Sequence, residues 1–324
     1  MMDEFRLIEQ IHNTIEDKQP GVRVGIGDDA AVIQLNVELE TICCVDTLCE
    51  GVHFKRSTMK PADIGYKALA VNISDVAAMG GKPKYYLVSI AVPRGWSDDE
   101  VLEIYEGMQR LAQQQGVHLI GGDSVTSKSE LYISVTVLGE VAKGRALLRS
   151  SAHVGDVVFV TGSLGGSAAG LEQLLDEDAN PNKAFVETHQ RPTMHTGVAQ
   201  MFTENSTRMA LNDISDGLSS EIWEIAESSG VHIELEESNI PMPELMEETF
   251  GRERSLRFAF NGGEDFQLLG TVAKEDWPRI AEEAKRIGDP LTLIGHVVGE
   301  GADVTLNSTT QKRRLLREGY THRS

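Results

Sequence analysis

The 324-residue sequence is poor in cysteine and in basic residues, and each shortage excludes a class of protein. Its three cysteines, Cys43, Cys44 and Cys49, lie in one short stretch whose spacing fits neither a disulfide framework nor a zinc knuckle. The 30 basic residues are outnumbered by 50 acidic ones, which gives a net charge of -20. This charge argues against nucleic acid or an anionic membrane as the main partner, so an anionic ligand would need a metal ion as mediator.

The sequence also has no apolar run long enough to span a bilayer. Residues 1–17 read as an acidic amphipathic helix and not as a signal peptide. We therefore expect a soluble cytoplasmic protein without a membrane partner. Hydrophobic residues make up 40% of the chain, enough for a well-formed core.

The chain divides into two halves that repeat an alternation of strands and helices. In the first half we expect strands at 41–48, 84–93, 118–124 and 130–141 and helices at 61–81 and 98–116. The pattern restarts after residues 144–156 with a strand, glycine turn and helix at 157–175, and with an acidic turn and helix at 210–230. Residues 176–196 are polar and read as a loop. We expect two α/β domains with mixed sheets, at 1–148 and 149–324.

Aspartates recur at glycine turns or among small residues, beside apolar segments. The five segments are Gly27-Asp28-Asp29, Val45-Asp46-Thr47, Asn72-Ile73-Ser74-Asp75, Gly121-Gly122-Asp123-Ser124 and Asn212-Asp213-Ile214-Ser215-Asp216-Gly217. Taken singly, each aspartate has an ordinary explanation as a helix cap or an Asx turn.

Asp75 fits that explanation least well, because it lies in a helix with apolar residues around nearly its whole circumference. A buried carboxylate without a partner costs several kcal/mol. The nearest basic residues, Lys67 and Lys82, are about two helical turns away. Asp75 therefore needs either a distant arginine or a metal ion.

If the five segments converge, their mutual repulsion requires cations. Two like charges 4 Å apart repel by about 4 kcal/mol at an effective dielectric of 20. Oxygen ligands favour a hard ion, and magnesium binds through few carboxylates plus substrate phosphates. The sequence thus predicts several magnesium ions and a nucleotide, although it has no GxxxxGK[ST] loop and no HRD or DFG motif.

The motifs GIGDDAAV, VDTLCEGVHF, NISDVAAMGG, LIGGDS, NDISDGL and GGEDFQLL resemble those of the thiamine-monophosphate kinase family, in its order and over essentially the whole chain. The resemblance implies the two-domain fold of aminoimidazole-ribonucleotide synthetase and a homodimer joined through its N-terminal sheets. It also implies in-line transfer of the γ-phosphoryl of ATP to thiamine monophosphate without a general base. The alternatives are another ATP-dependent synthetase of this fold and a non-enzymatic protein that binds divalent cations or a nucleotide.

The resemblance further implies roles for individual residues. Magnesium would be held by Asp29, Asp46, Asp75, Asp123, Asp213 and Asp216, and at the positions of Cys44 and Val45. ATP would contact Tyr105, Gly122, Asp123, Arg149 and Ser215, and thiamine monophosphate would contact His53, Glu264 and Tyr320. Among these, Asp46, Asp75 and Asp213 would position the transfer.

This sequence departs from the family at several of these positions. Cys44 and Val45 stand where the family often carries Ser or Thr, so a hydroxyl ligand is lost and a backbone carbonyl would have to serve. Ser124 replaces a usual Thr, and the aromatic residue that usually follows the terminal tyrosine is missing. Without the resemblance, His53 reads as a surface or packing residue and residues 312–314 as a solvated strand edge. Arg149 could meet an ATP phosphate or simply pair with an acidic neighbour at the domain junction.

Overall fold

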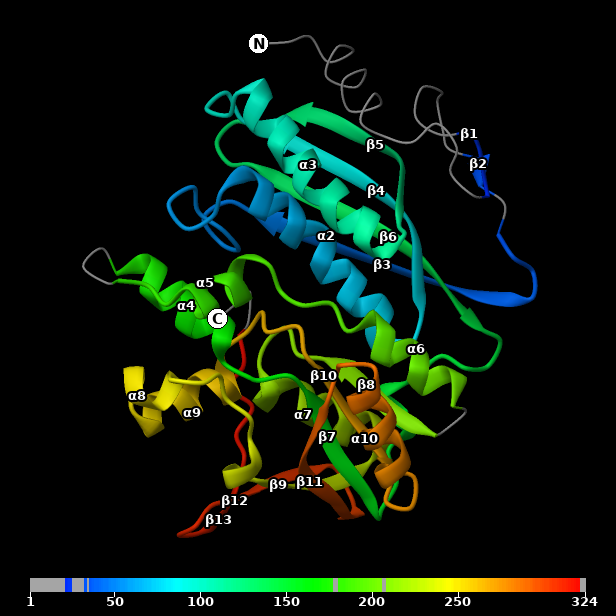
Figure 1. Cartoon of the computed structure of the whole chain (residues 1–324), viewed down its shortest axis with the longest axis vertical. Helices are drawn as coiled ribbons and strands as arrows, with labels where there is room; N and C mark the ends of the chain where they lie inside the picture. The colour runs from blue at the N-terminus through cyan, green and yellow to red at the C-terminus, as the bar shows by residue number, and fades with distance from the viewer. Residues whose placement is uncertain (1–20, 25–31, 34, 177–179, 206–207, 321–324) are drawn as a thin grey trace. The chain divides into compact units, whose positions relative to one another are not determined.

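The computed structural model describes residues 21–24, 32–33, 35–176, 180–205 and 208–320. The helix predicted at the N-terminus and the aspartates Asp28 and Asp29 lie outside these residues. The chain forms two compact units, of which the second comprises Ala77–Gly81 and everything from Arg145 onward. The sequence-based boundary at 148 lies close to Arg145. Both units combine a mixed β-sheet with helices (Figure 1).

The first unit is built on a four-stranded sheet of order β3-β6-β4-β5. Its strands are β3 (Leu39–Cys49), β6 (Tyr132–Ala142), β4 (Lys82–Val92) and β5 (His118–Thr126). The β4/β5 pair is parallel and the other pairs are antiparallel. A separate antiparallel pair joins β1 (Val22–Val24) to β2 (Val32–Ile33).

One face of this four-stranded sheet is covered by α2 (Pro61–Ala78) and α3 (Asp98–Gln115), as Figure 1 shows. Along β6, Ile133, Val135 and Val137 are fully buried and alternate with more exposed residues, the pattern of a sheet with one covered face. We call the other side, which carries Thr47, the open face.

The two helices touch through glycines. A Cβ atom on Gly65 of α2 would overlap the carbonyl oxygen of Ile104, and one on Gly107 of α3 would overlap that of Ala62. Only glycine allows this approach. The N-terminus of α3 is fixed by a capping box between Ser97 and Glu100.

The second unit is built on a seven-stranded sheet of order β13-β12-β9-β11-β7-β10-β8. These strands are β13 (Lys312–Arg314), β12 (Asp303–Asn307), β9 (Val231–Glu236), β11 (Leu291–Glu300), β7 (Asp156–Thr161), β10 (Leu268–Ala273) and β8 (Met209–Asp213). Only the β12/β9 pair is parallel. The edge position of exposed β13 confirms the reading of residues 312–314 as a strand edge.

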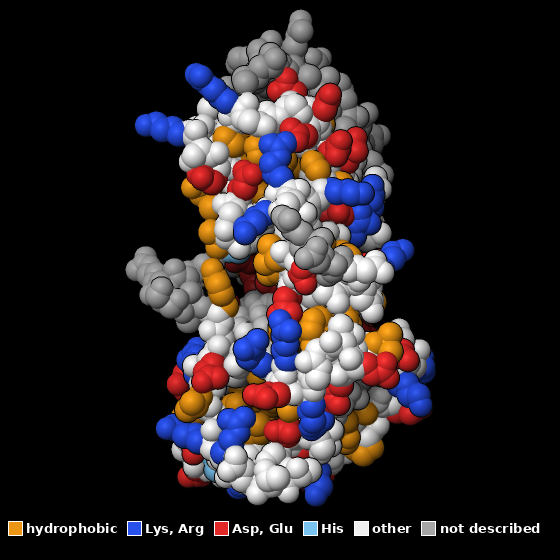
Figure 2. Space-filling model, turned by 90° about the vertical axis from the view of Figure 1, so that its left-hand side faces the viewer, with side chains coloured by type: hydrophobic (Ala, Val, Ile, Leu, Met, Phe, Trp, Pro, Cys, Tyr) orange, Lys and Arg blue, Asp and Glu red, His pale blue; other side chains and the backbone are white. Residues whose placement is uncertain are grey.

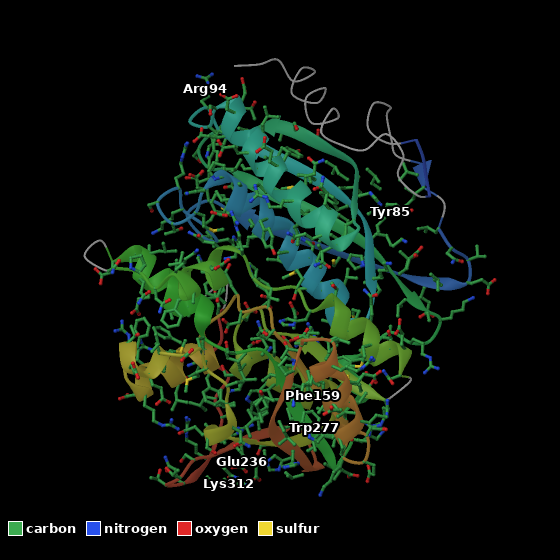
Figure 3. The ribbon with its side chains drawn as sticks, in the orientation of Figure 1. Tyr85, Arg94, Phe159, Glu236, Trp277 and Lys312 are labelled. Atoms are coloured by element: carbon green, nitrogen blue, oxygen red, sulfur yellow. The ribbon has the colours of Figure 1, made fainter. Side chains whose placement is uncertain are left out.

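Both faces of this sheet carry a hydrophobic core. Val158 and Val160 of β7 join one core with residues of α7 (Leu218–Ser229), whereas Val157 and Phe159 join the other with residues of α6 (Thr196–Glu204) and α10 (Trp277–Arg286). The Phe159 ring lies 5.9 Å from that of Trp277 between centroids (Figure 3). Burial on both sides explains the uninterrupted apolar run of β7.

The remaining helices include one that lies in the segment predicted to be a loop. These elements are η1 (Arg149–Ser151), α4 (Gly166–Leu175), α5 (Lys183–Gln190), η2 (Glu237–Asn239), α8 (Met246–Phe250) and α9 (Arg252–Asn261). The prediction of a loop over 176–196 is wrong at α5. Asn182 caps this helix by accepting the Ala184 N–H, and Phe185 packs into a small core with Met246 and Phe258.

The acidic excess does not form one continuous patch on the face drawn in Figure 2, where acidic and basic side chains are interspersed among the coloured residues. Within the described part of the chain, no helix is both long and apolar enough to cross a membrane.

Candidate active site

In the first unit, β3 and α2 are joined through the side chain of Asn72. Its Oδ1 accepts the backbone N–H of Asp46 at 3.0 Å, and its Nδ2 donates to the Ala68 carbonyl at 3.1 Å. The Cys44 thiol donates to the Asn72 carbonyl oxygen at 3.3 Å. Because Asn72 is fully buried, this contact holds Cys44 and Asp46 against the helix that carries Asp75.

Negative groups are crowded at this point. The side chains of Asp46 and Asp75 share a hydrogen bond, which requires a proton on one carboxyl when no cation is present. Burial raises the pKa of Asp46, and the bond from Asp75 and the nearby His53 oppose this rise. Burial, together with the charges of Asp75 and Asp46, also raises the pKa of the Cys44 thiol. Without a metal ion the thiol is therefore protonated, in agreement with its hydrogen bond to the Asn72 carbonyl oxygen.

This crowding fits a hard divalent cation. Magnesium usually takes one or two protein carboxylates and fills its other positions with water or phosphate oxygens. The Asp46–Asp75 pair supplies that number of ligands. Among the described residues, no group of three His, Cys, Asp or Glu side chains is arranged to hold a metal ion. Asp29, which the resemblance also assigns to magnesium, lies outside the described residues.

His53 lies on a tight loop that follows β3. Gly51 adopts a left-handed φ of 84° there, and the His53 N–H donates to the Cys49 carbonyl at 3.0 Å. The Cys49 N–H in turn donates to Nδ1 of His53 at 2.9 Å. Since Nδ1 is an acceptor, the neutral ring carries its proton on Nε2 and presents a hydrogen-bond donor.

The residues of this unit that the resemblance assigns to ATP lie on or beneath β5. Gly122 pairs with Val88 in the register of β4, and Asp123 pairs with Ser89. Tyr105 of α3 is buried beneath this strand, and burial raises the pKa of its phenol to about 12 despite a hydrogen bond with Ser124.

Asp46 and Asp123 lie at opposite edges of the sheet, on β3 and β5. Three strand spacings of about 4.8 Å separate the two strands, or about 14 Å. The register also aligns Asp123 with Ser89, Ser134 and Thr47 on the open face, whereas Asp46 aligns with buried Val135. One chain therefore does not bring these two carboxylates together. Val45, beside Asp46, points its side chain to the open face, where it is 60% exposed.

In the second unit, backbone hydrogen bonds join the acidic turn after β8 to the glycine loop before β10. The Glu264 N–H donates to the Ser215 carbonyl at 2.7 Å, and the Phe266 N–H donates to that of Ile214 at 2.8 Å. A Cβ atom on Gly263 would lie 2.6 Å from the Ser215 oxygen, so only glycine permits this approach. The two motifs, predicted separately from sequence, therefore form one structure.

The C-terminal segment joins the same turn. The Tyr320 N–H donates to the Asp216 carbonyl at 3.0 Å, and the Tyr320 side chain is 48% exposed. Asp213 is 4% exposed at the end of β8. Backbone hydrogen bonds thus join Glu264 and Tyr320 to neighbouring residues of one turn, Ser215 and Asp216, and Asp213 lies at the start of this turn.

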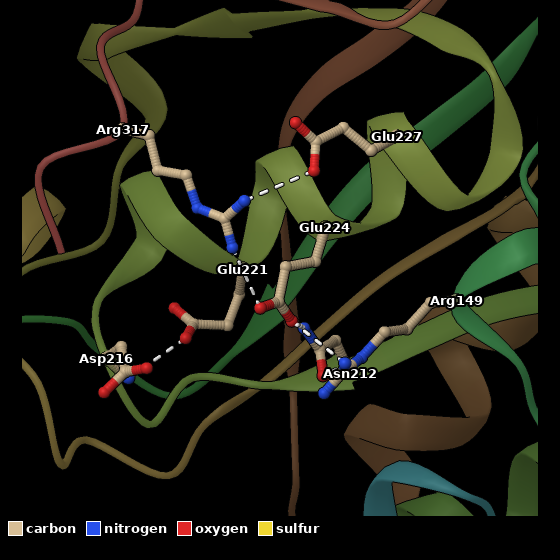
Figure 4. A network of polar contacts seen from close by, with 7 residues as sticks. All are labelled: Arg149, Asn212, Asp216, Glu221, Glu224, Glu227 and Arg317. Carbon is tan, nitrogen blue, oxygen red and sulfur yellow. Dashed lines mark hydrogen bonds and ion pairs between the residues drawn. The ribbon is translucent and has the colours of Figure 1, made fainter. Parts of the chain in front are cut away.

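Arg149 is held next to this turn by a polar network (Figure 4). Its Nε donates to Asn212 Oδ1 at 2.8 Å, and its Nη1 lies 3.1 Å from Glu224 Oε2. The other Glu224 oxygen pairs with Arg317 at 3.1 Å. The interpretation of Arg149 as a partner of an acidic residue is confirmed, and its half-exposed guanidinium still faces solvent.

Sequence reasoning missed Glu221, which belongs to the same network. Its Oε1 accepts the Asp216 N–H at 3.0 Å, while its Oε2 is buried without a hydrogen-bond partner. Burial raises its pKa to about 9, with the Asp216 charge adding to the rise. The available signal was an acidic residue in the first turn of α7, directly before the apolar residues Ile222 and Trp223.

Both units match known domain families. Residues 27–141 match the AIR synthase related protein, N-terminal domain, and residues 153–307 match its C-terminal domain. The chain is 46% identical to a thiamine-monophosphate kinase from Bacillus subtilis (strain 168), over 99% of each chain.

Solved structures agree with this assignment. The thiamine-monophosphate kinase of Stenotrophomonas maltophilia K279a superimposes with a TM-score of 0.84 at 33% identity, over 94% of this chain and 97% of that one. AaThiL, in complex with AMPPCP and TMP, gives a TM-score of 0.74 at 33% identity, over 98% and 99% of the two chains. The chain therefore belongs to the thiamine-monophosphate kinase family of phosphotransferases, built from two AIR synthase related domains.

Proposed function

We propose that this chain transfers the γ-phosphoryl group of ATP to thiamine monophosphate and yields thiamine diphosphate and ADP. Family membership supports the reaction, as does the relative whose structure holds AMPPCP and TMP. The observation that carries the proposal is the bonding of the 213–217 turn to Glu264 and Tyr320. These bonds join Glu264 and Tyr320, which we assign to the acceptor, to Ser215 and Asp216, which we assign to ATP and magnesium.

The acceptor supplies its own nucleophile. A phosphate monoester has a second pKa near 6, so it is mostly dianionic at pH 7 and needs no general base. One of its oxygens forms the new bond to the γ-phosphorus as the bond to the β-γ bridging oxygen breaks. ADP leaves with that electron pair. Catalysis then depends on in-line positioning and on neutralising the charge of two anions.

Residues of this chain would hold each reactant in place. The Nε2–H of His53 would donate to an oxygen of the acceptor phosphate, because its Nδ1 is already engaged by Cys49. Glu264 would accept a hydrogen bond from the aminopyrimidine, and Tyr320 would stack on the cationic thiazolium. Arg149, Ser215, Gly122 and Tyr105 would contact ATP.

Magnesium would be held by Asp46 and Asp75 in the first unit, and by Asp213 and Asp216 in the second. Asp123, and the backbone at Cys44 and Val45, would contribute further oxygen ligands. The bound ions would neutralise phosphate charge and align the transferred group.

We also propose that the active form is a homodimer joined through the open face of the four-stranded sheet. This face carries the exposed apolar side chains of Val45, Val125 and Tyr132, which are 60%, 50% and 41% exposed. A second copy would cover them. Asp123 would then complete a site whose Asp46 comes from the other copy, since the two are about 14 Å apart within one chain.

The deciding experiment is an incubation with ATP, magnesium and thiamine monophosphate. We expect thiamine diphosphate and ADP in equal amounts and no free phosphate. Release of free phosphate without thiamine diphosphate would instead indicate a synthetase of the same fold. Binding of ATP and magnesium without turnover would indicate a non-enzymatic role.

A further inference from the structure

The loop that carries Glu264 contains two residues in an unfavourable conformation. Glu264 and Phe266 have φ values of 69° and 51°, in the left-handed region that residues with a Cβ rarely adopt. Neither is glycine, although Gly262 and Gly263 directly precede them. Such strain persists only where surrounding contacts impose it.

The residue between them, Asp265, provides those contacts. Its side chain is fully buried, and its two carboxylate oxygens accept the backbone N–H groups of Gly165 at 2.5 Å and Ser167 at 3.0 Å. These N–H groups lie at the start of α4, where Gly165 has no side chain to cap the helix. Asp265 thereby fastens the loop to α4 on one side, while Glu264 and Phe266 fasten it to the 213–217 turn on the other.

The side chain of Glu264 is also linked to Ser167, through His189. The Ser167 hydroxyl lies 3.0 Å from Nδ1 of His189, a ring that is 1% exposed, and this Nδ1 lies 3.5 Å from Glu264 Oε2. Ser167 therefore contacts Asp265 through its backbone and His189 through its hydroxyl. Glu264, Asp265, Ser167 and His189 form a closed ring that restrains Glu264 at both backbone and carboxylate.

We propose that Asp265 is a positioning residue for the acceptor: it holds Glu264 in a strained, preorganised conformation in which its carboxylate receives the amino group of the substrate. This inference rests on the proposed function, because Glu264 matters only if it meets the acceptor. Asp265 itself does not touch the substrate. A ligand-contacting residue that is fixed before binding loses little conformational entropy when the ligand arrives.

The test compares Asp265→Asn and Asp265→Ala with the wild-type enzyme. Either variant should raise the KM for thiamine monophosphate by about 10- to 100-fold, the cost of misplacing a contacting group, while the KM for ATP changes by less than about twofold. Glu264→Gln should show the same asymmetry. Ser167→Ala retains the N–H that Asp265 accepts but loses the hydroxyl contact to His189, so its effect should be smaller.

A matched control comes from Asp156, a buried carboxylate at the start of β7. It is 2% exposed and pairs with Arg208 at 2.6 Å, away from the loop. Asp156→Asn should lower stability while leaving the ratio of the two KM values unchanged. Equal shifts of both KM values in Asp265→Asn, or no shift in either, would overturn the proposal.

A second measurement does not depend on turnover. Hydrogen exchange should show that the amides of Glu264 and Phe266 lose protection in Asp265→Asn but not in Asp156→Asn. Unchanged protection would also overturn the inference, even if the wild-type chain proved inactive. An inactive wild-type chain whose loop loses protection in Asp265→Asn would instead refute the proposed function and retain the anchoring of the loop.

Discussion

The backbone N–H of Tyr320 donates to the carbonyl oxygen of Asp216 at 3.0 Å, which anchors the C-terminal segment to the acidic turn. Gly319 makes this approach possible. A Cβ atom there would lie 2.7 Å from the Cβ of Ser220 and 2.8 Å from the Asp216 oxygen. Tyr320 is thus placed by the residue before it.

Gly319→Ala should therefore weaken acceptor binding without unfolding the protein. Releasing one ordered side chain costs about 0.5–1.5 kcal/mol, so the KM for thiamine monophosphate should rise by about 2- to 12-fold. The control is Gly299→Ala, where the nearest atom to a new Cβ is the Cβ of His232 at 3.9 Å. Steady-state kinetics that do not distinguish the two variants would contradict the anchoring role.

Asp75→Asn should remove most activity and leave the fold intact. The substitution removes one of two carboxyl groups that share a hydrogen bond, so magnesium would lose a ligand that supplies charge stabilisation of several kcal/mol. We expect kcat/KM to fall by about 100-fold or more. Circular dichroism and the metal-free melting temperature should remain close to those of the wild type, since the Asn amide can donate to Asp46 in place of the protonated carboxyl. Full activity in this variant would refute the metal site.

The wide separation of Asp46 and Asp123 leads to a complementation experiment. Asp46→Asn and Asp123→Asn should each be inactive as homodimers. If each site takes these residues from different copies, a mixed dimer has one intact site and one site that lacks both carboxylates. Half of the dimers in an equal mixture are mixed, so the mixture should show about a quarter of the wild-type activity.

The outcome also separates the possible arrangements of the site. If Asp46 and Asp123 of a site came from the same copy, every site in the mixture would lack one carboxylate and no activity would be recovered. Tandem affinity tags on the two variants verify that mixed dimers have formed. Recovery of activity when no mixed dimers have formed would exclude the proposed exchange of residues between copies.

Much of the fold could be predicted from local patterns, because a long amphipathic or fully apolar segment indicates by itself whether it forms a helix or a strand. The heavily buried α2 and the twice-covered β7 are examples. Helix α5 was missed because only Phe185 and His189 of its eight residues are buried, which leaves little periodicity to detect.

The site could be predicted only where a motif carries its own signal. Asp213 and Asp216 stand out in an acidic turn, but the role of Asp265 depends on Gly165, a partner 100 positions away. Glu221 and Asn72 are similar cases, since their roles depend on hydrogen bonds between separate segments of the chain. The strand order that separates Asp46 from Asp123 is likewise set by tertiary pairing.

Asp265 also predicts a pH dependence of stability. Burial raises the pKa of its carboxyl from 3.8 to about 7, and the N–H groups of Gly165 and Ser167 only partly offset this. The folded state therefore binds more protons than the unfolded state between these two values. Its free energy of unfolding must fall as pH rises across that window, and this group adds no further slope above it.

The pH dependence of the unfolding free energy should differ between the wild type and Asp265→Asn only by this contribution, because all other titrating groups are common to both. A shift of this size corresponds to a change on the order of 4 kcal/mol in the stability difference between pH 4 and pH 7. Urea unfolding in metal-free buffer at half-unit pH steps measures it. A difference that stays constant from pH 4 to pH 8 would mean that the folded carboxyl titrates at its ordinary pKa, and that the N–H bonds at the start of α4 outweigh the cost of burial.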